Sequence, residues 1–479
     1  MKIFASLTIA FCLLVGHSAC AQTPQTKHRL IVLTDIEADP DDTQSLVRLL
    51  LYANSIDIEG LVATTSVWQK TRVAPESIRR VIRAYGKVQP NLSRHEPGYP
   101  DTESMLALVS EGLAVYGMQG VGEDKDSPGS ERLIKSLEKD DSRPLWVSVW
   151  GGANTLAQAL HKIRSVKSKT EAKRLIGKLR VYTISDQDDS GIWIRNTFPE
   201  LFYIVSPGDH YTSATWSAIN TVVDGVDNQR INNPWLAQHI QQGHGPLGAA
   251  YPDVAWGLEG DTPSFLSLIP NGLNKPERPD WGGWGGRYEL SKPSADATRK
   301  GDSGVPLSSE TREIWTDTVD NYTPFVQSEF GRAIRRGETS FSDNKVTLWR
   351  WRDDFQNDFA ARMDWCSASY EKTNHPPVPA LSHPDEVTVE SGGSLSLDAS
   401  GCTDPDGDSL SYLWFNYPEA GTHKQEIIVN QPGNTPTAWV KIPEVEEIQT
   451  AHFILRVTDK GSPPLSRYKR VVVNIASKQ

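Results

Sequence analysis

The sequence predicts an α/β domain with a mostly parallel sheet, followed by an all-β immunoglobulin-like sandwich. Strand-like and helix-like runs alternate from residue 29 to about residue 205, which is typical of a parallel sheet covered by helices on both faces. Short alternating runs separated by Gly, Pro and Asn turns fill the last hundred residues, as in a sandwich. The length of 479 residues also exceeds what one hydrophobic core usually supports.

The N-terminal 21 residues have the order of a secretory signal peptide. Lys2 precedes an apolar run over residues 3–15 and small residues that end in Ala19-Cys20-Ala21. We expect cleavage after Ala21 and export to the periplasm or the extracellular space. The alternative is a lipoprotein signal with acylation of Cys20. The apolar run is too short for a transmembrane anchor.

Two cysteines remain after this cleavage, Cys366 and Cys402. An exported compartment permits a disulfide between them, which would connect the end of the first domain to the second. The sequence leaves open whether they form this bridge or stay as thiols, because it does not show their geometry.

The α/β domain is predicted over residues 28–340. Its buried strands are expected within residues 29–35, 56–66, 144–152, 178–185 and 201–205, and its helices within 41–54 and 153–163. Residues 206–335 are rich in Gly, Pro and Trp, and such long irregular segments usually serve as binding or lid loops. A helix over 346–366 lies in a connector spanning 341–374, and the Pro-rich segment 375–381 opens a sandwich domain over 375–479.

Composition restricts the function. With 49 basic and 60 acidic residues, the formal charge is −11, which gives no basic footprint for nucleic acid. The 15 tryptophans suggest aromatic surfaces of the kind that bind sugars. The sequence leaves the oligomeric state undetermined.

Five acidic residues follow the first predicted strand within eight positions. They are Asp35, Glu37, Asp39, Asp41 and Asp42. Ligands of open α/β sheets bind at the carboxyl ends of strands, and crowded carboxylates repel one another unless a cation such as Ca²⁺ or Mg²⁺ neutralises them. The alternative is that these acids only cap the following helix, but one Asp would suffice for that. The pattern therefore favours a metal site.

Four segments resemble the nucleoside hydrolases, in order and in spacing. They are VLTDIEADPDDTQSL (32–46), GLVATT (60–65), WGGANTLAQAL (150–160) and GDTPSFLSLIP (260–270). A closer resemblance, which includes SDQDDSG (185–191) and WGGWGGRYE (281–289), is to exported bacterial proteins that carry such a domain and a C-terminal sandwich. That group is named for a cellulose-binding member.

The resemblance to nucleoside hydrolases implies a Ca²⁺ site and a set of roles. Asp35 would be a ligand and the general base toward a metal-bound water, Asp42 a bidentate ligand, and Asp261 a late ligand. The carbonyl of Trp150 would also bind the ion, and Asp41 would hold a sugar hydroxyl. A cation lowers the pKa of its water, and a carboxylate removes the proton as the water attacks the anomeric carbon.

The substrate pocket departs from the resemblance, and its residues are predicted from position. Trp68 and Gln69 stand where the family has a sugar-binding Asn, and Gly260 replaces a His. Side chains of the SDQDDSG segment are expected at the same sheet edge, and two tryptophans of WGGWGGRYE could stack on sugars. The predicted substrate contacts are therefore Asp41, Trp68, Gln69, Asp186, Gln187, Asp188, Trp281 and Trp284.

Three functions remain open from the sequence. One is an exported Ca²⁺-dependent hydrolase of N- or O-glycosidic bonds that acts on a sugar, nucleoside-like or glycan-derived substrate. The second is a non-catalytic protein on the same scaffold that binds cellulose or another carbohydrate. The third is an interaction or structural module in a cell-surface complex. The general acid is unassigned, with His244 and Glu259 as weak candidates.

Overall fold

The computed structural model describes residues 26–211, 215–294, 301, 303–327 and 334–477. The predicted signal peptide and the alternative lipid attachment at Cys20 lie outside these residues. In the described part of the chain, every helix is too short or too polar to cross a lipid bilayer.

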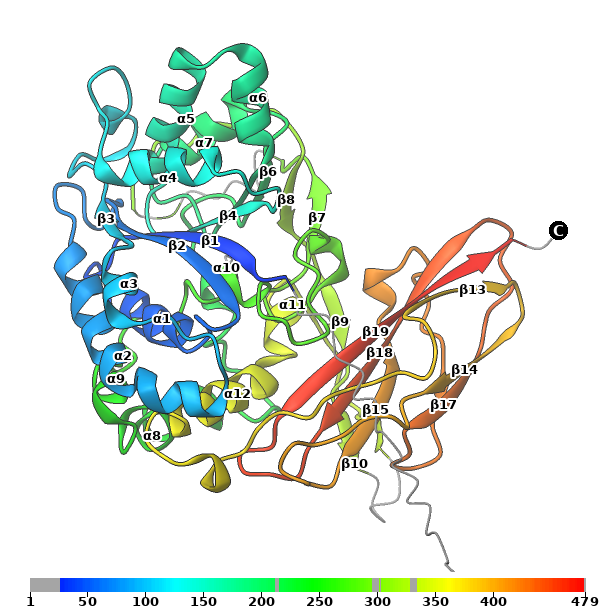
Figure 1. The fold of residues 1–479 in the computed structure, drawn as a ribbon. Coiled ribbons are helices and arrows are strands. Elements are labelled where there is room, and N and C mark those ends of the chain that lie inside the picture. Colours follow the sequence, from blue (N-terminus) through cyan, green and yellow to red (C-terminus); the bar gives the residue numbers. More distant parts are fainter. Residues whose placement is uncertain (1–25, 212–214, 295–300, 302, 328–333, 478–479) are drawn as a thin grey trace, which may run out of the picture.

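An eight-stranded sheet forms the centre of the first domain, in the order β3-β2-β1-β4-β5-β6-β8-β7 (Figure 1). Every neighbouring pair is parallel except β7 with β8. The strands are β1 (His28–Thr34), β2 (Ile56–Ala63), β3 (Val109–Glu111), β4 (Leu145–Val149), β5 (Leu179–Thr183), β6 (Phe202–Val205), β7 (Tyr288–Ser291) and β8 (Ile314–Asp317). The central strands are apolar throughout because both faces of the sheet are covered.

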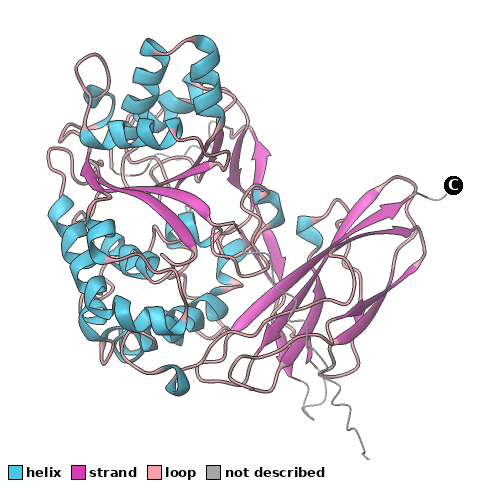
Figure 2. Ribbon diagram, viewed as in Figure 1, coloured by secondary structure: helices cyan, strands magenta, loops and turns pink. Residues whose placement is uncertain are grey.

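Helices cover the two faces of this sheet in two separate hydrophobic clusters (Figure 2). One face carries α4 (Pro128–Glu138), α5 (Asn154–Val166), α6 (Lys169–Gly177) and α7 (Ser190–Thr197). The other carries α1 (Asp41–Leu50), α2 (Pro75–His95), α3 (Thr102–Leu106), α9 (Gly245–Ala249), α10 (Pro263–Leu266) and α12 (Arg352–Asp364). The shorter α8 (Asn233–Leu236) and α11 (Val346–Trp349) complete the helices.

The C-terminal domain is built from two sheets with a core of its own. One sheet has the order β13-β19-β18-β15 and the other β14-β17-β16. The strands are β13 (Glu386–Glu390), β14 (Ser394–Asp398), β15 (Ser411–Asn416), β16 (Val429–Asn430), β17 (Thr437–Lys441), β18 (Gln449–Thr458) and β19 (Ser466–Ala476). The predicted α/β fold followed by an all-β region is thus confirmed.

Between β8 and α11 the chain forms two small antiparallel ribbons. β9 (Asp320–Tyr322) pairs with β12 (Phe341–Asp343), and β10 (Phe325–Gln327) pairs with β11 (Ile334–Arg336). The helix expected over residues 346–366 is interrupted, because Arg350 and Trp351 separate α11 from α12.

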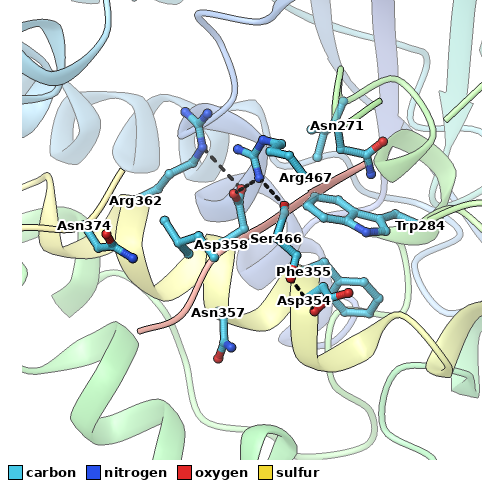
Figure 3. A network of polar contacts seen from close by, with 12 residues as sticks. Asn271, Trp284, Asp354, Phe355, Asn357, Asp358, Arg362, Asn374, Ser466 and Arg467 are labelled. Carbon is cyan, nitrogen blue, oxygen red and sulfur yellow. Dashed lines mark hydrogen bonds and ion pairs between the residues drawn. The ribbon is translucent and has the colours of Figure 1, made fainter. Parts of the chain in front are cut away.

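Helix α12 connects the domains through buried ion pairs and hydrogen bonds (Figure 3). Asp358 accepts a hydrogen bond from Tyr52 of α1 at 2.6 Å and forms an ion pair with Arg467 of β19 at 2.6 Å. Asp354 accepts a hydrogen bond from Ser466 at 2.9 Å. One side of this polar helix is therefore buried against the first domain, and another side is buried against the C-terminal domain.

The sequence left a Cys366–Cys402 bridge open, and the structure has free thiols at both positions. Cys366 lies in the core of the first domain, where its thiol contacts the carbonyl oxygen of Arg362 at 3.6 Å. Cys402 packs at the edge of the sandwich core, against Ala380. The two thiols are free because each belongs to a different hydrophobic cluster.

Candidate active site

The candidate site lies where the strand order reverses. From β1 the chain proceeds outward to β2 and β3 and then returns to β4 on the other side of β1. The ends of β1 and β4 therefore diverge into different loops and leave a crevice between them, the usual ligand position in open α/β sheets. Asp35 directly follows β1, and Trp150 directly follows β4. Asp261 comes from the segment before α10.

A cavity of about 480 Å³ occupies this crevice. Its lining combines carboxylates with aromatic rings. The lining residues are Asp35, Ala38, Asp39, Asp41, Asp42, Trp68, Trp150, Gln187, Tyr211, Trp216, Trp256 and Asp261. No Lys or Arg is among these described lining residues, so no side-chain cation neutralises the acids there.

Four of these carboxylates are almost fully buried. Asp35, Asp41, Asp42 and Asp261 are each no more than 3% exposed. Burial raises the pKa of Asp35 to about 6 and raises the pKa values of the other three well above the ordinary Asp range. The negative charges of neighbouring aspartates add to the increase in each pKa.

The surrounding backbone and hydroxyl groups hold these carboxylates in place. The hydroxyl of Thr34 donates a hydrogen bond to Asp42, and Ser66 bonds to Asp35. A Cβ at Gly151 would lie 2.5 Å from the Asp35 carboxylate, so only glycine lets the β4 loop pass so closely. Asp39 accepts the N–H of Asp41 at 3.0 Å, so capping explains only this one acid.

The arrangement of the acids suits a hard divalent cation. Asp39, Asp41 and Asp42 each offer an oxygen within 4.8 Å of the others. One carboxylate oxygen of Asp261 is buried and has no hydrogen-bond partner. An unpaired buried carboxylate oxygen is costly, and carboxylate oxygens are the ligands that Ca²⁺ prefers. The residues that could hold the ion include the predicted Asp35, Asp42 and Asp261.

The carbonyl of Trp150, the fourth predicted ligand, already has a partner. The side-chain amide of Gln187 donates a hydrogen bond to it. Both residues line the cavity, so Gln187 is correctly placed at the site. The Trp150 carbonyl could bind an ion only if it accepts this hydrogen bond and the ion together.

The aromatic wall contains residues that the sequence analysis missed. The indole N–H of Trp216 donates to Asp41 at 2.5 Å, and the indole of Trp68 donates to the Tyr211 hydroxyl at 3.0 Å. Trp256 completes the wall. The long loops after β6 supply Tyr211, Trp216 and Trp256, and no motif marked them. Only the richness of that region in tryptophan could have indicated them.

Gly260 explains how Trp216 reaches the acids. A Cβ at this position would lie 1.9 Å from the indole ring of Trp216 and 2.6 Å from the Asp41 carboxylate. Gly260, which stands where the nucleoside hydrolases have a His, therefore leaves room for the indole ring of Trp216. The ring takes the space beside Asp41 that a larger residue at position 260 would fill.

Two predicted substrate contacts have structural partners instead. Asp186 forms a buried ion pair with Arg195 at 2.9 Å, and both side chains are fully buried. Asp188 accepts backbone N–H groups of Ser190 at 2.9 Å and Asn154 at 3.2 Å. These carboxylates fix the loops after β5 and β4, so their assignment to substrate is corrected.

Trp68 and Gln69 differ in their position relative to the cavity. Trp68 lines the cavity as predicted and is 55% exposed. The amide of Gln69 donates to the backbone carbonyls of Asp35 and Ile36, both at 3.3 Å. Gln69 therefore supports the acidic loop from behind and does not line the cavity, which corrects its assignment.

Trp281 and Trp284 lie at the boundary between the domains and not at the site. Trp284 is fully buried and packs edge-on against Phe355 and Tyr468, with ring centroids 6.2 and 6.4 Å away. Trp281 packs edge-on against His452 at 4.6 Å. Their assignment as sugar-stacking rings is wrong, because the glycines around them bring this segment against the sandwich.

The weak candidates for a general acid are also occupied elsewhere. Glu259 is fully buried in an ion pair with Arg48, and it accepts a hydrogen bond from Tyr251 at 2.6 Å. His244 contacts Asp364 at 3.0 Å. Neither residue lines the cavity among its described residues.

The fold and this acidic crevice define a protein with a nucleoside hydrolase-like domain and a C-terminal β domain. Residues 29–288 match the family model described as "Cellulose-binding Sde182, nucleoside hydrolase-like domain". Residues 394–475 match that of the "Cellulose-binding protein Sde0182, C-terminal domain". The chain belongs to this Sde182 family.

The solved structure of a related protein agrees with this assignment. A nucleoside hydrolase-related protein from Saccharophagus degradans, described as associated with carbohydrate metabolism, is 35% identical, with a TM-score of 0.77. The match covers 94% of this chain and all of that one. A PKD domain from the KIAA 1837 protein is 23% identical over 21% of this chain and 87% of its own, with a TM-score of 0.16. The chain matches no curated protein.

Proposed function

We propose that this protein is an exported, Ca²⁺-dependent hydrolase of glycosidic bonds that acts on a sugar or glycan-derived substrate. The observation that carries this proposal is the group of buried carboxylates on the wall of an aromatic-lined cavity. Strongly perturbed acids in a cleft are typical of catalytic sites. Export follows from the signal-like sequence of residues 1–21.

Asp35, Asp42 and Asp261, with the Trp150 carbonyl, would hold the ion. When bound, Ca²⁺ supplies positive charge that neutralises these carboxylates and makes a nearby water more acidic. Asp41 would bond a sugar hydroxyl through the oxygen that does not receive the indole N–H of Trp216. The rings of Trp68 and Trp216 exclude water from the faces of the sugar.

Asp35 would act as the general base. It takes a proton from the attacking water as the water oxygen bonds to the anomeric carbon. The electron pair of the glycosidic bond passes to the leaving atom, which takes a proton from solvent at the cavity mouth. Asp35 then releases its proton to solvent. Burial raises the pKa of the Asp35 carboxyl to about 6, which supports its role as a base.

A non-catalytic carbohydrate-binding function is the second candidate. It is favoured because the weak acid candidates, Glu259 and His244, are held by Arg48 and Asp364 away from the cavity. The cellulose-binding description of the family points the same way. The same cavity would then bind sugar without cleaving it.

Hydrolysis assays separate the two candidates. The full chain without its signal segment is incubated with nucleosides and with plant-glycan oligosaccharides, in Ca²⁺ or in chelator. Turnover that chelator abolishes and that Asp35→Asn reduces at least about a hundredfold supports the hydrolase. Asp353→Asn is the control, because Asp353 is a half-exposed acid on α12 that does not line the cavity. Sugar binding without turnover on either panel would overturn the hydrolase and leave the binding function.

A further inference from the structure

A second hollow of about 850 Å³ adjoins the acidic cavity. Ala38, Asp39 and Trp256 line both hollows, so the two adjoin at these residues. We refer to the second hollow as the outer groove. The combined space exceeds that of an average small-molecule site, roughly 300–1,000 Å³, and extends past the acids.

The outer groove is lined by both apolar and polar side chains. The apolar ones include small residues of α2 and of α9 and its flanks, such as Ala84, Pro246, Ala249 and Ala250. Glu37, Thr43 and Arg80 are among the polar ones. Sugar rings have apolar faces and hydroxyls around their rims, so a lining of both kinds suits them.

Trp256 stands at the junction of the two hollows with 77% of its surface exposed. A large aromatic side chain in this position leaves much apolar area in water, and aromatic residues with one free face are typical of binding sites. Single exposed apolar residues are common on protein surfaces and need no function. The position of Trp256 on both linings distinguishes it from such residues.

Glu37 is held away from the other acids of its loop. Its φ of 81° is unusual for a residue other than glycine. Ser77 and Arg72 both bond its carboxylate, and Arg80 lies 3.8 Å away. These contacts turn Glu37 out of the acidic cavity and into the outer groove, where Glu37 and Arg80 present both charges to hydroxyl groups.

We propose that the outer groove is a second sugar subsite, which holds the continuation of an oligosaccharide chain beyond the unit in the acidic cavity. The proposal rests on the proposed function in taking the acidic cavity as a sugar site. Because the outer groove adjoins the acidic cavity, one sugar chain that extends across both hollows is favoured over a separate ligand in the groove. The substrate class is therefore an oligosaccharide or polysaccharide, and a nucleoside would leave the outer groove empty.

The test compares short and long sugars. Titration calorimetry measures the affinities of cellobiose and cellohexaose, xylobiose and xylohexaose, and laminaribiose and laminarihexaose in Ca²⁺. The host is the full unmutated chain, and non-hydrolysable thio-linked analogues replace any sugar that it cleaves. We expect at least one hexasaccharide to bind more tightly than its disaccharide. Because Trp256 lines both hollows, Trp256→Ala should weaken that hexasaccharide about tenfold and weaken the disaccharide by a smaller factor.

The control is Trp439→Ala, which removes another exposed tryptophan, 52% exposed on β17 of the sandwich. It should leave both affinities unchanged. Equal hexasaccharide affinity with and without Trp256, or no gain with length in any pair, would overturn the proposal. The proposal would also be overturned if the unmutated chain formed a dimer and Trp256→Ala abolished it, because the groove would then bind a second copy of the protein. Absence of hydrolysis by the unmutated chain would refute only the hydrolase, because the length series still decides the subsite.

Discussion

At the scale of single residues, two glycines determine how closely the loops of the site approach. Gly151 lets the loop after β4 pass beside Asp35, and Gly260 admits the Trp216 ring beside Asp41. Neither role could be read from the sequence, because both depend on neighbours that are distant along the chain. The resemblance to nucleoside hydrolases identified Gly260 as a departure, and the structure gives its physical reason.

Gly260→Ala should disturb the site, because its methyl group would overlap the Trp216 ring. We expect at least about 1 kcal/mol of lost stability, together with weaker sugar binding. Gly177→Ala at the end of α6 is the control, since a Cβ there meets nothing within 4 Å. Denaturant unfolding and sugar titration measure both effects. Equal behaviour of the two variants would contradict the role given to Trp216.

The acids also predict a pH dependence. Burial raises the pKa of Asp35 to about 6, whereas an unfolded Asp titrates near ~3.9. Between these values the folded, ion-free chain holds a proton that the unfolded chain has lost. The free energy of unfolding therefore falls as pH rises through this window.

Ca²⁺ binds the ionised carboxylate, so the affinity of the protein for Ca²⁺ should be at least about tenfold weaker at pH 5 than at pH 7.5. Calcium titrations that give the same affinity at both values would contradict this.

At the scale of elements, the sequence correctly predicted the strands and turns that depend on local residue patterns. The β1 strand and its acids, the β4 strand with its Gly-Gly turn, and the all-β region were recognised from periodicity and turn residues. The Trp281–Trp284 segment was misread because its partners, His452, Tyr468 and Phe355, come from other parts of the chain. Asp186 was misread for the same reason, since its partner Arg195 lies on α7.

Helix α12 is the element on which the domain boundary depends. Asp358 holds Tyr52 and Arg467 from opposite sides, and replacing it by Ala would leave the Arg467 guanidinium without its partner. We expect Asp358→Ala to lower the free energy of unfolding by about 3 kcal/mol. Asp353→Ala on the same helix, 52% exposed, should cost less than about 1 kcal/mol. Equal losses for the two variants in urea unfolding would show that this contact does not stabilise the boundary.

At the scale of the whole molecule, the two domains share an interface that buries Trp284 and much of α12 (Figure 3). Ending the chain at residue 374 would expose Trp284 and remove the partners that Asp354 and Asp358 have on β19. We expect this truncated protein to melt at least about 5 °C below the full chain. A melting temperature equal to that of the full chain would show that the sandwich contributes no stability to the α/β domain.

The free thiols test the arrangement of the domains in another way. With Cys366 and Cys402 in separate cores, a reducing agent should leave the melting temperature of the oxidised, purified protein unchanged. Thiol titration after denaturation should find both groups free in the chain without its first 21 residues. A lower melting temperature in reductant would instead indicate a bridge.

The central claim is that the buried carboxylates form a Ca²⁺ site, and calcium titration calorimetry at pH 7.5 tests it most directly. We predict that the full chain binds Ca²⁺ and that Asp42→Asn abolishes binding at this site, because it removes a buried ligand charge. The control is Asp408→Asn in the second group of aspartates, Asp404, Asp406 and Asp408, on the sandwich. It should leave that binding intact. Ca²⁺ binding by Asp42→Asn that equals that of the unmutated chain would contradict the account.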